Sequence, residues 1–247
     1  MDKNFSKFIK DLEAFDIHLS EKQLDQFSKY YDLLVEWNQK MNLTAITDFD
    51  DVCQLHFVDS ISSCKYFDFT QDNICVIDIG TGAGFPGIPL KIVFPNLNIT
   101  LFDSLQKRLN FLNEVIEQLQ LNNDCGKIET VHGRAEDFSS YNSGNLREKY
   151  DLAISRAVAN LSTLSEFCLP YVKVGGKFIC YKGEKIFEEL PSGKKAIHLL
   201  GGKFNDLYEF YLPNSDIRRF ICVSDKVEKT SKNYPRKAGV PAKNPLC

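Results

Sequence analysis

The chain has 247 residues, of which 43% are hydrophobic and 26% are charged, and its formal net charge is -3. This composition excludes a disordered or polycationic protein and is typical of a folded chain that buries a full core. No apolar run approaches the roughly 18 residues that a membrane span requires, and the N-terminus has no signal-peptide core. The eight cysteines contain no CxxC pair and the four histidines are scattered, so we expect neither disulfides nor a metal site. These features indicate a soluble, reduced, cytoplasmic protein, which we expect to be a monomer.

Residues 1–70 are expected to form a helical N-terminal extension. Apolar side chains at 5, 8, 9, 12 and 15 recur at the spacing of one helix face. Ser20, followed three residues later by Gln23, is typical of a capping box that opens a second helix, whose apolar face continues to about residue 41. The pattern at 49–66 is weaker but also predicts a helical segment.

Strands and helices alternate within an expected domain at 71–225. Five apolar runs separated by helical patterns indicate parallel strands buried on both faces. Two more runs leave no room for a helix between them and should pair antiparallel. The predicted fold is therefore α/β, with a mostly parallel seven-stranded sheet that contains one antiparallel strand. The expected strands are 74–79, 98–103, 127–132, 150–155, 175–182, 203–212 and 217–224.

The segment VIDIGTGAGFPGIPL joins the first strand to a helix through a glycine-rich turn. Such a turn exposes backbone N–H groups at a helix N-terminus, which suits a carboxylate or phosphate. Gly82, Gly84 and Gly87 match the dinucleotide pattern GxGxxG, which is a weak signal alone. Asp78 precedes them at the strand tip, where it would repel a pyrophosphate and attract an ammonium group. This charge argument favours S-adenosylmethionine over NAD.

The ends of the next strands carry further candidate cofactor contacts. Asp103 ends the second strand, 19 residues past Gly84, where a carboxylate can accept hydrogen bonds from both ribose hydroxyls. Its alternative role is that of a helix N-cap. Ala135 and Glu136 follow the third strand, where backbone amides can read an adenine edge; an ordinary acidic turn is the alternative.

Arg156, at the end of the fourth strand in ISRAVANL, is the candidate catalytic residue. The chain lacks the Asp/Asn-Pro-Pro-aromatic run that exocyclic amine methylation usually requires, and it has no cysteine beside this strand tip for attack on a pyrimidine carbon. An acceptor such as a purine N7 carries no proton and requires no general base, so positioning can supply most of the rate. A cation here can hold a substrate or cofactor anion; a surface salt bridge is the alternative.

Charge is unevenly distributed, and a basic tail is expected at 226–247. Residues 1–60 carry 6 Lys/Arg and 12 Asp/Glu, whereas residues 218–247 carry 8 and 2. Phosphate contacts from the tail would give salt-dependent RNA affinity, and Tyr234 could stack on an unpaired base. A solvated surface tail is the alternative. No secondary structure is evident in its last 20 residues, and its candidate cations are Lys226, Lys229, Lys232, Arg236, Lys237 and Lys243.

Several of these stretches together resemble the small-subunit ribosomal RNA methyltransferase G family, also called glucose-inhibited division protein B. The resemblance implies a Rossmann-like class I methyltransferase with a helical extension. It also implies S-adenosylmethionine-dependent methylation of the N7 of one guanine in 16S rRNA, in the 530 loop of the decoding region, in the bacterial cytoplasm. The matching stretches are WNQKMNLTAI (37–46), LHFVDSI (55–61), DIGTGAGFPGIPL (78–90), LFDSLQKRLNFL (101–112), ISRAVANL (154–161) and YPRKAGVPAKNPL (234–246).

The motif positions also assign site residues by resemblance. Cofactor contacts fall on Gly80, Phe85, Ala135, Glu136 and Arg156, to which the arguments above add Gly82 and Asp103. In the extension, Asn42, His56 and Asp59 are expected to contact RNA or to brace the extension against the glycine turn, and for His56 a packing or capping role is equally open. Three other functions remain as alternatives: a methyltransferase for another RNA, a protein or a small molecule, an NAD-dependent oxidoreductase, and an RNA-binding module without activity.

Overall fold

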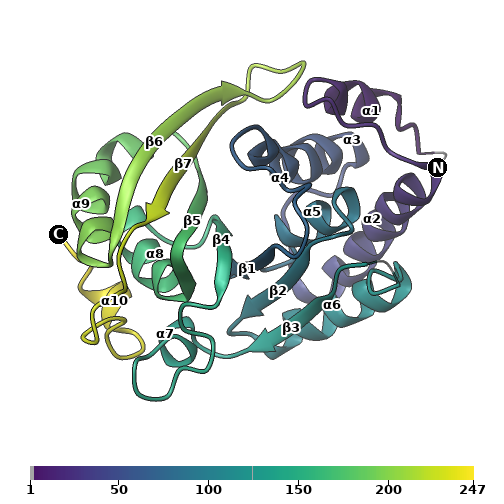
Figure 1. Cartoon of the computed structure of the whole chain (residues 1–247). Helices are drawn as coiled ribbons and strands as arrows, with labels where there is room; N and C mark the ends of the chain where they lie inside the picture. The colour runs from purple at the N-terminus through teal and green to yellow at the C-terminus, as the bar shows by residue number, and fades with distance from the viewer. Residues whose placement is uncertain (1–2, 124) are drawn as a thin grey trace.

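A seven-stranded sheet forms the centre of the computed structural model, which describes residues 3–123 and 125–247 (Figure 1). The strand order is β3-β2-β1-β4-β5-β7-β6. β7 is antiparallel to both of its neighbours, whereas β1 to β5 are parallel, which confirms the predicted sheet. The strands are β1 (Cys75–Ile79), β2 (Asn98–Asp103), β3 (Ile128–His132), β4 (Tyr150–Arg156), β5 (Val172–Lys182), β6 (Gly202–Tyr211) and β7 (Arg218–Lys226).

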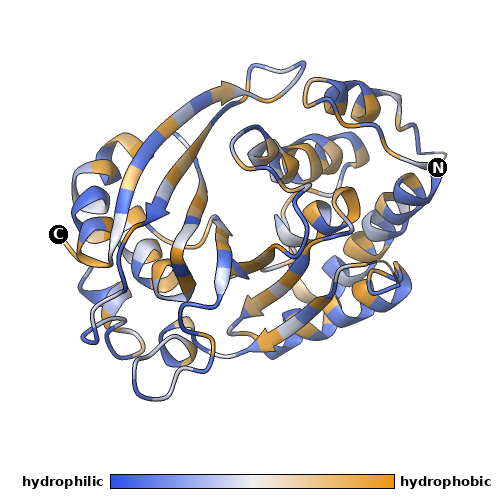
Figure 2. Cartoon of the chain, viewed as in Figure 1, coloured by the Kyte–Doolittle hydropathy of each residue, from blue (hydrophilic) through white to orange (hydrophobic). Residues whose placement is uncertain are grey.

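The central strands are apolar on both faces because helices cover both sides of the sheet. Along β1, Val76 belongs to one core cluster, while Ile77 and Ile79 belong to the other. β6 lies at the edge of the sheet and alternates hydrophobic with hydrophilic residues (Figure 2). The sheet helices are α5 (Gly87–Val93), α6 (Gln106–Gln118), α7 (Ala135–Phe138), α8 (Leu161–Cys168), the short η3 (Leu169–Tyr171) and α9 (Ile186–Leu199).

The N-terminal helices pack on the same side of the sheet as α5 and α6 (Figure 1). The Ser20 capping box is present, and the expected segment at 49–66 is helical with a π-helical stretch in its middle. The hydroxyl of Tyr30 donates to the Ala83 carbonyl at 2.6 Å, and the ring centroids of Tyr30 and Phe85 lie 5.5 Å apart. The extension is therefore anchored on the glycine turn. Its elements are α1 (Ser6–Glu13), α2 (Glu21–Met41), α3 (Phe49–Val52), η1 (Cys53–Val58), α4 (Asp59–Ile61) and η2 (Ser62–Lys65).

The C-terminal segment packs against the domain and ends in a short helix, α10 (Val240–Lys243), that the sequence did not reveal. Lys226 was expected to contact RNA, but it is buried, and its ammonium donates to the carbonyls of Leu169 and Leu200. Burial lowers the pKa of Lys226 to about 8. Arg236 is likewise engaged with Glu166, which is fully buried. The cations of this segment that remain exposed are Lys229, Lys232, Lys237 and Lys243.

Two negative findings concern the described residues only. None of their helices combines the length and the hydropathy needed to cross a membrane. They also contain no group of three or more His, Cys, Asp or Glu side chains that could hold a metal ion.

Candidate active site

The glycine turn lies over the carboxyl ends of β1 and β2. Gly80 donates to the Phe102 carbonyl at 2.8 Å, and Gly82 donates to the Asp103 carboxylate at 3.0 Å. Both glycines have left-handed backbone angles, with φ of 70° and 60°. A Cβ on Gly80 would lie 2.5 Å from Val158, whereas a Cβ on Gly82 would make only an ordinary contact, 3.9 Å from the Gly80 carbonyl oxygen. Gly80 is therefore required for close packing and Gly82 for its conformation.

Asp78 supports this turn from below and does not line a cavity. It is fully buried, and one carboxylate oxygen accepts from the Thr81 hydroxyl at 2.7 Å and from the Gly87 N–H at 2.9 Å. Its other oxygen is buried without a partner in the described part of the chain. The carboxylate tethers the start of α5, and its burial speaks against direct contact with a cofactor ammonium, whereas attraction through water stays a prediction.

Asp78 gives the first testable prediction, which concerns stability against pH. Burial raises the pKa of Asp78 to about 7, so the native state favours the protonated acid, and this contribution to stability is lost as pH rises from about 4 to about 7. Between about pH 4 and pH 7, the free energy of unfolding of the wild type should fall relative to that of Asp78→Asn. Above about pH 7 the difference between the two proteins should stay constant. Urea unfolding at several pH values measures the difference.

The comparison with the variant is necessary because His56 acts in the opposite direction. Burial and the nearby Arg156 lower the pKa of His56 to about 4, so this contribution to stability is lost as pH falls from about 6.5 to 4. His56 is unchanged in the Asp78 variant and cancels in the difference. A constant difference between the two proteins from pH 4 to 7 would contradict the prediction.

A cavity of about 400 Å³ opens beside the turn at the ends of β1, β2 and β4. Four of the predicted cofactor residues line it: Gly80, Asp103, Ala135 and Glu136. Asp103 is buried and also accepts from the Leu105 N–H at 2.9 Å and from Arg108 at 3.3 Å. A carboxylate has about four acceptor positions, of which these donors and Gly82 use three, so one is free for a ligand and a second becomes free if Arg108 moves away. We call this space the cofactor cavity.

The C-terminal segment forms one wall of the cofactor cavity. Gly239 and Ala242 line it, and the Gly239 N–H donates to the Glu136 carboxylate at 2.8 Å. Arg236 fixes the segment by donating to both oxygens of Glu166, at 2.6 to 3.1 Å. A segment that we expected to contact RNA phosphates therefore closes part of the cofactor cavity.

Three other predicted site residues do not line the cofactor cavity. Gly82 donates its N–H to Asp103, which does line it. Phe85 is buried beneath Arg156, whose guanidinium carbon lies 5.0 Å from the centroid of the Phe85 ring. Arg156 donates to Asp59 at 2.9 Å and to the Leu55 carbonyl at 3.2 Å, and one of its nitrogens lies 3.3 Å from His56. The extension thus holds Arg156 in place, and Asp59 and His56 take the bracing role.

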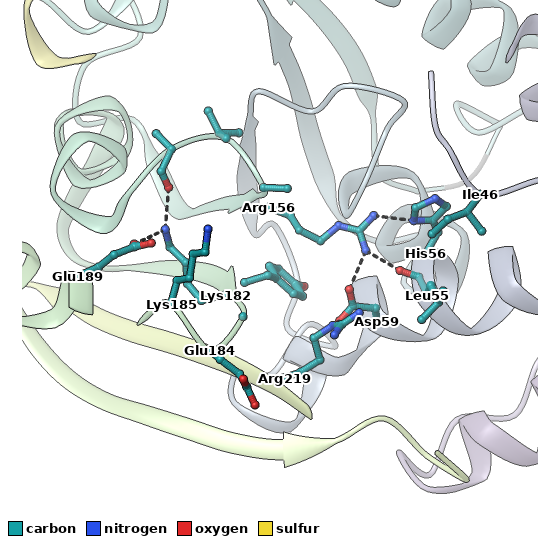
Figure 3. A pocket seen from close by; sticks show the side chains of 15 residues that line it. Ile46, Leu55, His56, Asp59, Arg156, Lys182, Glu184, Lys185, Glu189 and Arg219 are labelled. Carbon is teal, nitrogen blue, oxygen red and sulfur yellow. Dashed lines mark hydrogen bonds and ion pairs between the residues drawn. The ribbon is translucent and has the colours of Figure 1, made fainter. Parts of the chain in front are cut away.

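Arg156 faces a second cavity of about 660 Å³ (Figure 3). In this view Arg156, His56 and Asp59 lie on one side, and Lys182 and Glu189 lie on the other. Asp59 also accepts from Arg219 at 3.2 Å. The two cavities share the residues Ala157 and Val158 in their linings, so the loop after β4 separates them. We call this space the acceptor cavity.

Four of the titratable groups that line the acceptor cavity are weak bases or already accept hydrogen bonds. His56 is a weak base, because burial and Arg156 lower its pKa to about 4. Burial raises the pKa of Tyr181, whose hydroxyl donates to Ser60 and Ser63. The carboxylates of Asp59 and Glu189 accept from arginine and lysine. The cavity therefore suits an acceptor that is nucleophilic without deprotonation.

Sequence reasoning did not find several residues of this site. Val158, Lys182, Glu189, Arg219 and Gly239 were not singled out, although Val158 lies within the ISRAVANL motif. Lys182 ends the fifth predicted strand, and its position at that strand tip was the available signal. Arg219 lies inside a strand, and its partner Asp59 is 160 residues away, so no local pattern indicates it.

Solved structures identify the class of this fold. A methyltransferase from Pyrococcus furiosus superposes with a TM-score of 0.52 at 15% identity, covering 81% of this chain and 98% of the other. A SAM-dependent methyltransferase from Aquifex aeolicus gives 0.52 at 16% identity, covering 72% and 93%. With the strand order and the antiparallel β7, these similarities define the fold as that of class I methyltransferases.

Sequence comparisons then identify the family. The model of the GidB family, described as rRNA small subunit methyltransferase G, matches residues 23–215. The ribosomal RNA small subunit methyltransferase G of Acetivibrio thermocellus is 52% identical over 238 residues, which cover 96% of this chain and 95% of the relative. That of Lactococcus lactis is 48% identical, covering 97% and 98%. The chain belongs to the rRNA small subunit methyltransferase G family, as its motifs predicted.

Proposed function

We propose that this protein transfers the methyl group of S-adenosylmethionine to the N7 of a guanine in the 530 loop of 16S rRNA, in the bacterial cytoplasm. The observation that carries the proposal is the pair of cavities separated by Ala157 and Val158. One presents a carboxylate for a ribose, and in the other the carboxylates of Asp59 and Glu189 are paired with arginine and lysine. Membership in an rRNA methyltransferase family supports the substrate class.

The proposed reaction requires no proton transfer. The N7 lone pair attacks the methyl carbon, the carbon–sulfur bond breaks, and its electrons remain on sulfur to give neutral S-adenosylhomocysteine. The guanine becomes a cation with a methyl group on N7. Catalysis then depends on holding the two reactants in line and excluding water.

The site residues divide between the two cavities in this proposal. Asp103 binds the ribose hydroxyls, while Gly80, Ala135 and Glu136 contact the remainder of the cofactor. Gly82 orients Asp103, and its left-handed conformation places its N–H on that carboxylate. Arg156, stacked on Phe85 and held by Asp59, acts from the acceptor cavity, where it positions the RNA and borders the methyl group.

RNA affinity is proposed to come from the exposed lysines of the C-terminal segment. Lys237 and Lys243 flank Gly239 and Ala242, which line the cofactor cavity, so phosphates bound there would lie near its mouth. The chain as a whole carries a net charge of -3, so the positive charge proposed to bind RNA is confined to this segment. Selectivity would then depend on RNA shape or on a preassembled particle as partner.

Methylation of small ribosomal subunits from a strain that lacks this protein tests the function. Incubation with radiolabelled S-adenosylmethionine should label 16S rRNA, and mass spectrometry of the digested RNA should identify 7-methylguanosine. Labelling of another nucleoside, or calorimetric binding of NAD in place of S-adenosylhomocysteine, would contradict the proposal.

The C-terminal wall gives a second prediction. Arg236→Gln should weaken binding of S-adenosylhomocysteine by about tenfold, because it frees the segment that carries Gly239 and leaves the buried Glu166 with fewer donors. Calorimetry measures the affinity.

A matched control distinguishes the role of this segment in cofactor binding from its role in RNA binding. The double variant Lys237→Gln Lys243→Gln removes exposed charge from the same segment, and it should lower RNA affinity and the slope of that affinity against salt while leaving cofactor binding unchanged. Wild-type cofactor affinity in Arg236→Gln would show that the wall does not contribute.

A further inference from the structure

The partition between the two cavities is formed by Ala157 and Val158, in the loop after β4. Ala157 has a left-handed backbone angle of 59°, and Val158 packs directly over Gly80. A group bound in the acceptor cavity therefore approaches the cofactor only past these two residues. A ring nitrogen that accepts the methyl group must face this partition.

A lysine–glutamate pair stands on the other wall of the acceptor cavity (Figure 3). The ammonium of Lys182 donates to one Glu189 oxygen at 2.7 Å and to the Ala159 carbonyl at 2.7 Å. The same Glu189 oxygen accepts from the Leu161 N–H at 2.7 Å. Lys182 ends β5, Glu189 lies on α9 and Leu161 begins α8, so three elements fix the pair.

The pair keeps unused hydrogen-bonding capacity. Within residues 3–123 and 125–247, the second carboxylate oxygen of Glu189 has no hydrogen-bond partner, and Lys182 uses two of the three protons of its ammonium. Only 9% of the Lys182 side chain and 20% of the Glu189 side chain is exposed, so solvent competes weakly. The pair thus offers one anionic acceptor beside one cationic donor, both on side chains that line the cavity.

We propose that the acceptor cavity holds the target guanine outside its base stack, and that Glu189 and Lys182 bind its N1–H and O6 atoms. This inference rests on the proposed function. An acceptor beside a donor matches these two neighbouring positions, and a ligand cavity of about 660 Å³ lies in the usual range. On the purine ring O6 lies between N1 and N7, so a guanine held in this way can turn N7 toward Val158.

The contact with Glu189 strengthens as the reaction proceeds. Methylation at N7 places a positive charge on the guanine and makes its N1–H a stronger donor, so the carboxylate stabilises the transition state more than the bound substrate. Interactions of this kind raise kcat as well as affinity. We therefore expect Glu189 to determine base specificity and also to raise kcat.

Glu189→Gln provides the first test. It should lower kcat/KM on undermethylated small subunits by about 10- to 100-fold, the range for loss of a two-point base contact, with part of the loss in kcat. S-adenosylhomocysteine affinity, measured by calorimetry, should stay at the wild-type value, which also shows that the variant is folded. Glu188→Gln makes the same charge change at an exposed position one residue earlier and should behave as wild type.

Base substitution in the RNA provides the second test. With 2-aminopurine at the target position, which retains N7 but lacks O6 and N1–H, wild-type methylation should fall by a similar factor, and Glu189→Gln should lose little more. Equal losses from the base change in both enzymes, or wild-type kinetics in Glu189→Gln, would overturn the proposal. Failure of the wild type to form 7-methylguanosine on natural RNA would instead overturn the proposed function.

Discussion

Asp59→Ala should lower the free energy of unfolding by about 3 kcal/mol and abolish measurable methylation. Asp59 is nearly buried and holds two arginines, Arg156 at 2.9 Å and Arg219 at 3.2 Å. Removal of one partner from a buried ion pair typically costs about 3–5 kcal/mol because a charge remains uncompensated. The Arg219 side chain is 27% exposed, so water can hydrate its charge, whereas that of Arg156 is only 12% exposed. We therefore expect a loss at the lower end of this energy range. Guanidinium chloride unfolding measures the loss.

Two further variants separate stability from function. Glu36→Ala removes an exposed carboxylate of the same extension, paired to Lys40 one helical turn away, and should change stability by less than about 0.5 kcal/mol. Asp59→Ala combined with Arg156→Met replaces the unpaired cation by an apolar side chain, and it should regain stability without regaining methylation. Recovery of activity in this double variant would remove Arg156 from the proposed mechanism.

The pattern of the chain was sufficient to predict the sheet because strands buried on both faces are continuous apolar runs. The predicted strand at 98–103 has the same bounds as β2 in the structure. β6 and β7 pair antiparallel, as the short connection between them predicts. The order of the strands cannot be read from such runs, since it depends on which faces the helices cover. It was not predicted and follows only from the folded structure.

The side on which a residue lies was harder to predict than its element. Asp78 was correctly placed near the tip of β1, but side chains alternate along a strand, and its position puts it on the face with Val76, beneath the turn. The same limitation applied to Arg156, which was placed at the tip of β4. Its partner Asp59 is 97 residues away on the extension, and only the folded structure brings the two together.

The C-terminal segment shows why charge counts alone mislead. Its composition indicated a free basic arm, yet Lys226 and Arg236 are used to attach it to the domain. The acids that hold the segment, Glu166 and Glu136, lie on α8 and α7, so no pattern within the segment predicts the attachment. Its exposed lysines remain consistent with the proposed RNA contacts.

Asp103→Ala is expected to weaken S-adenosylhomocysteine binding by roughly 100-fold or more, because hydrogen bonds from two ribose hydroxyls to a carboxylate contribute about 1.5–3 kcal/mol each and are lost together. The substitution also removes the acceptor of the Gly82 N–H, so the glycine turn loses one of its bonds to β2 while the bond from Gly80 to the Phe102 carbonyl remains. Calorimetry measures the affinity, and thermal unfolding checks that the fold is retained.

Two controls isolate the ribose contact from these side effects. Gly82 and Leu105 donate to different oxygens of Asp103, so Asp103→Asn keeps an acceptor for one of them and loses the charge. Its affinity should therefore lie between those of wild type and Asp103→Ala. Asp137→Ala removes an exposed carboxylate in the first turn of α7, close to Glu136 in the chain, and should bind as wild type does. If Asp103→Ala instead binds with wild-type affinity, Asp103 serves only to shape the turn and the start of α6, and the ribose must be held by other groups.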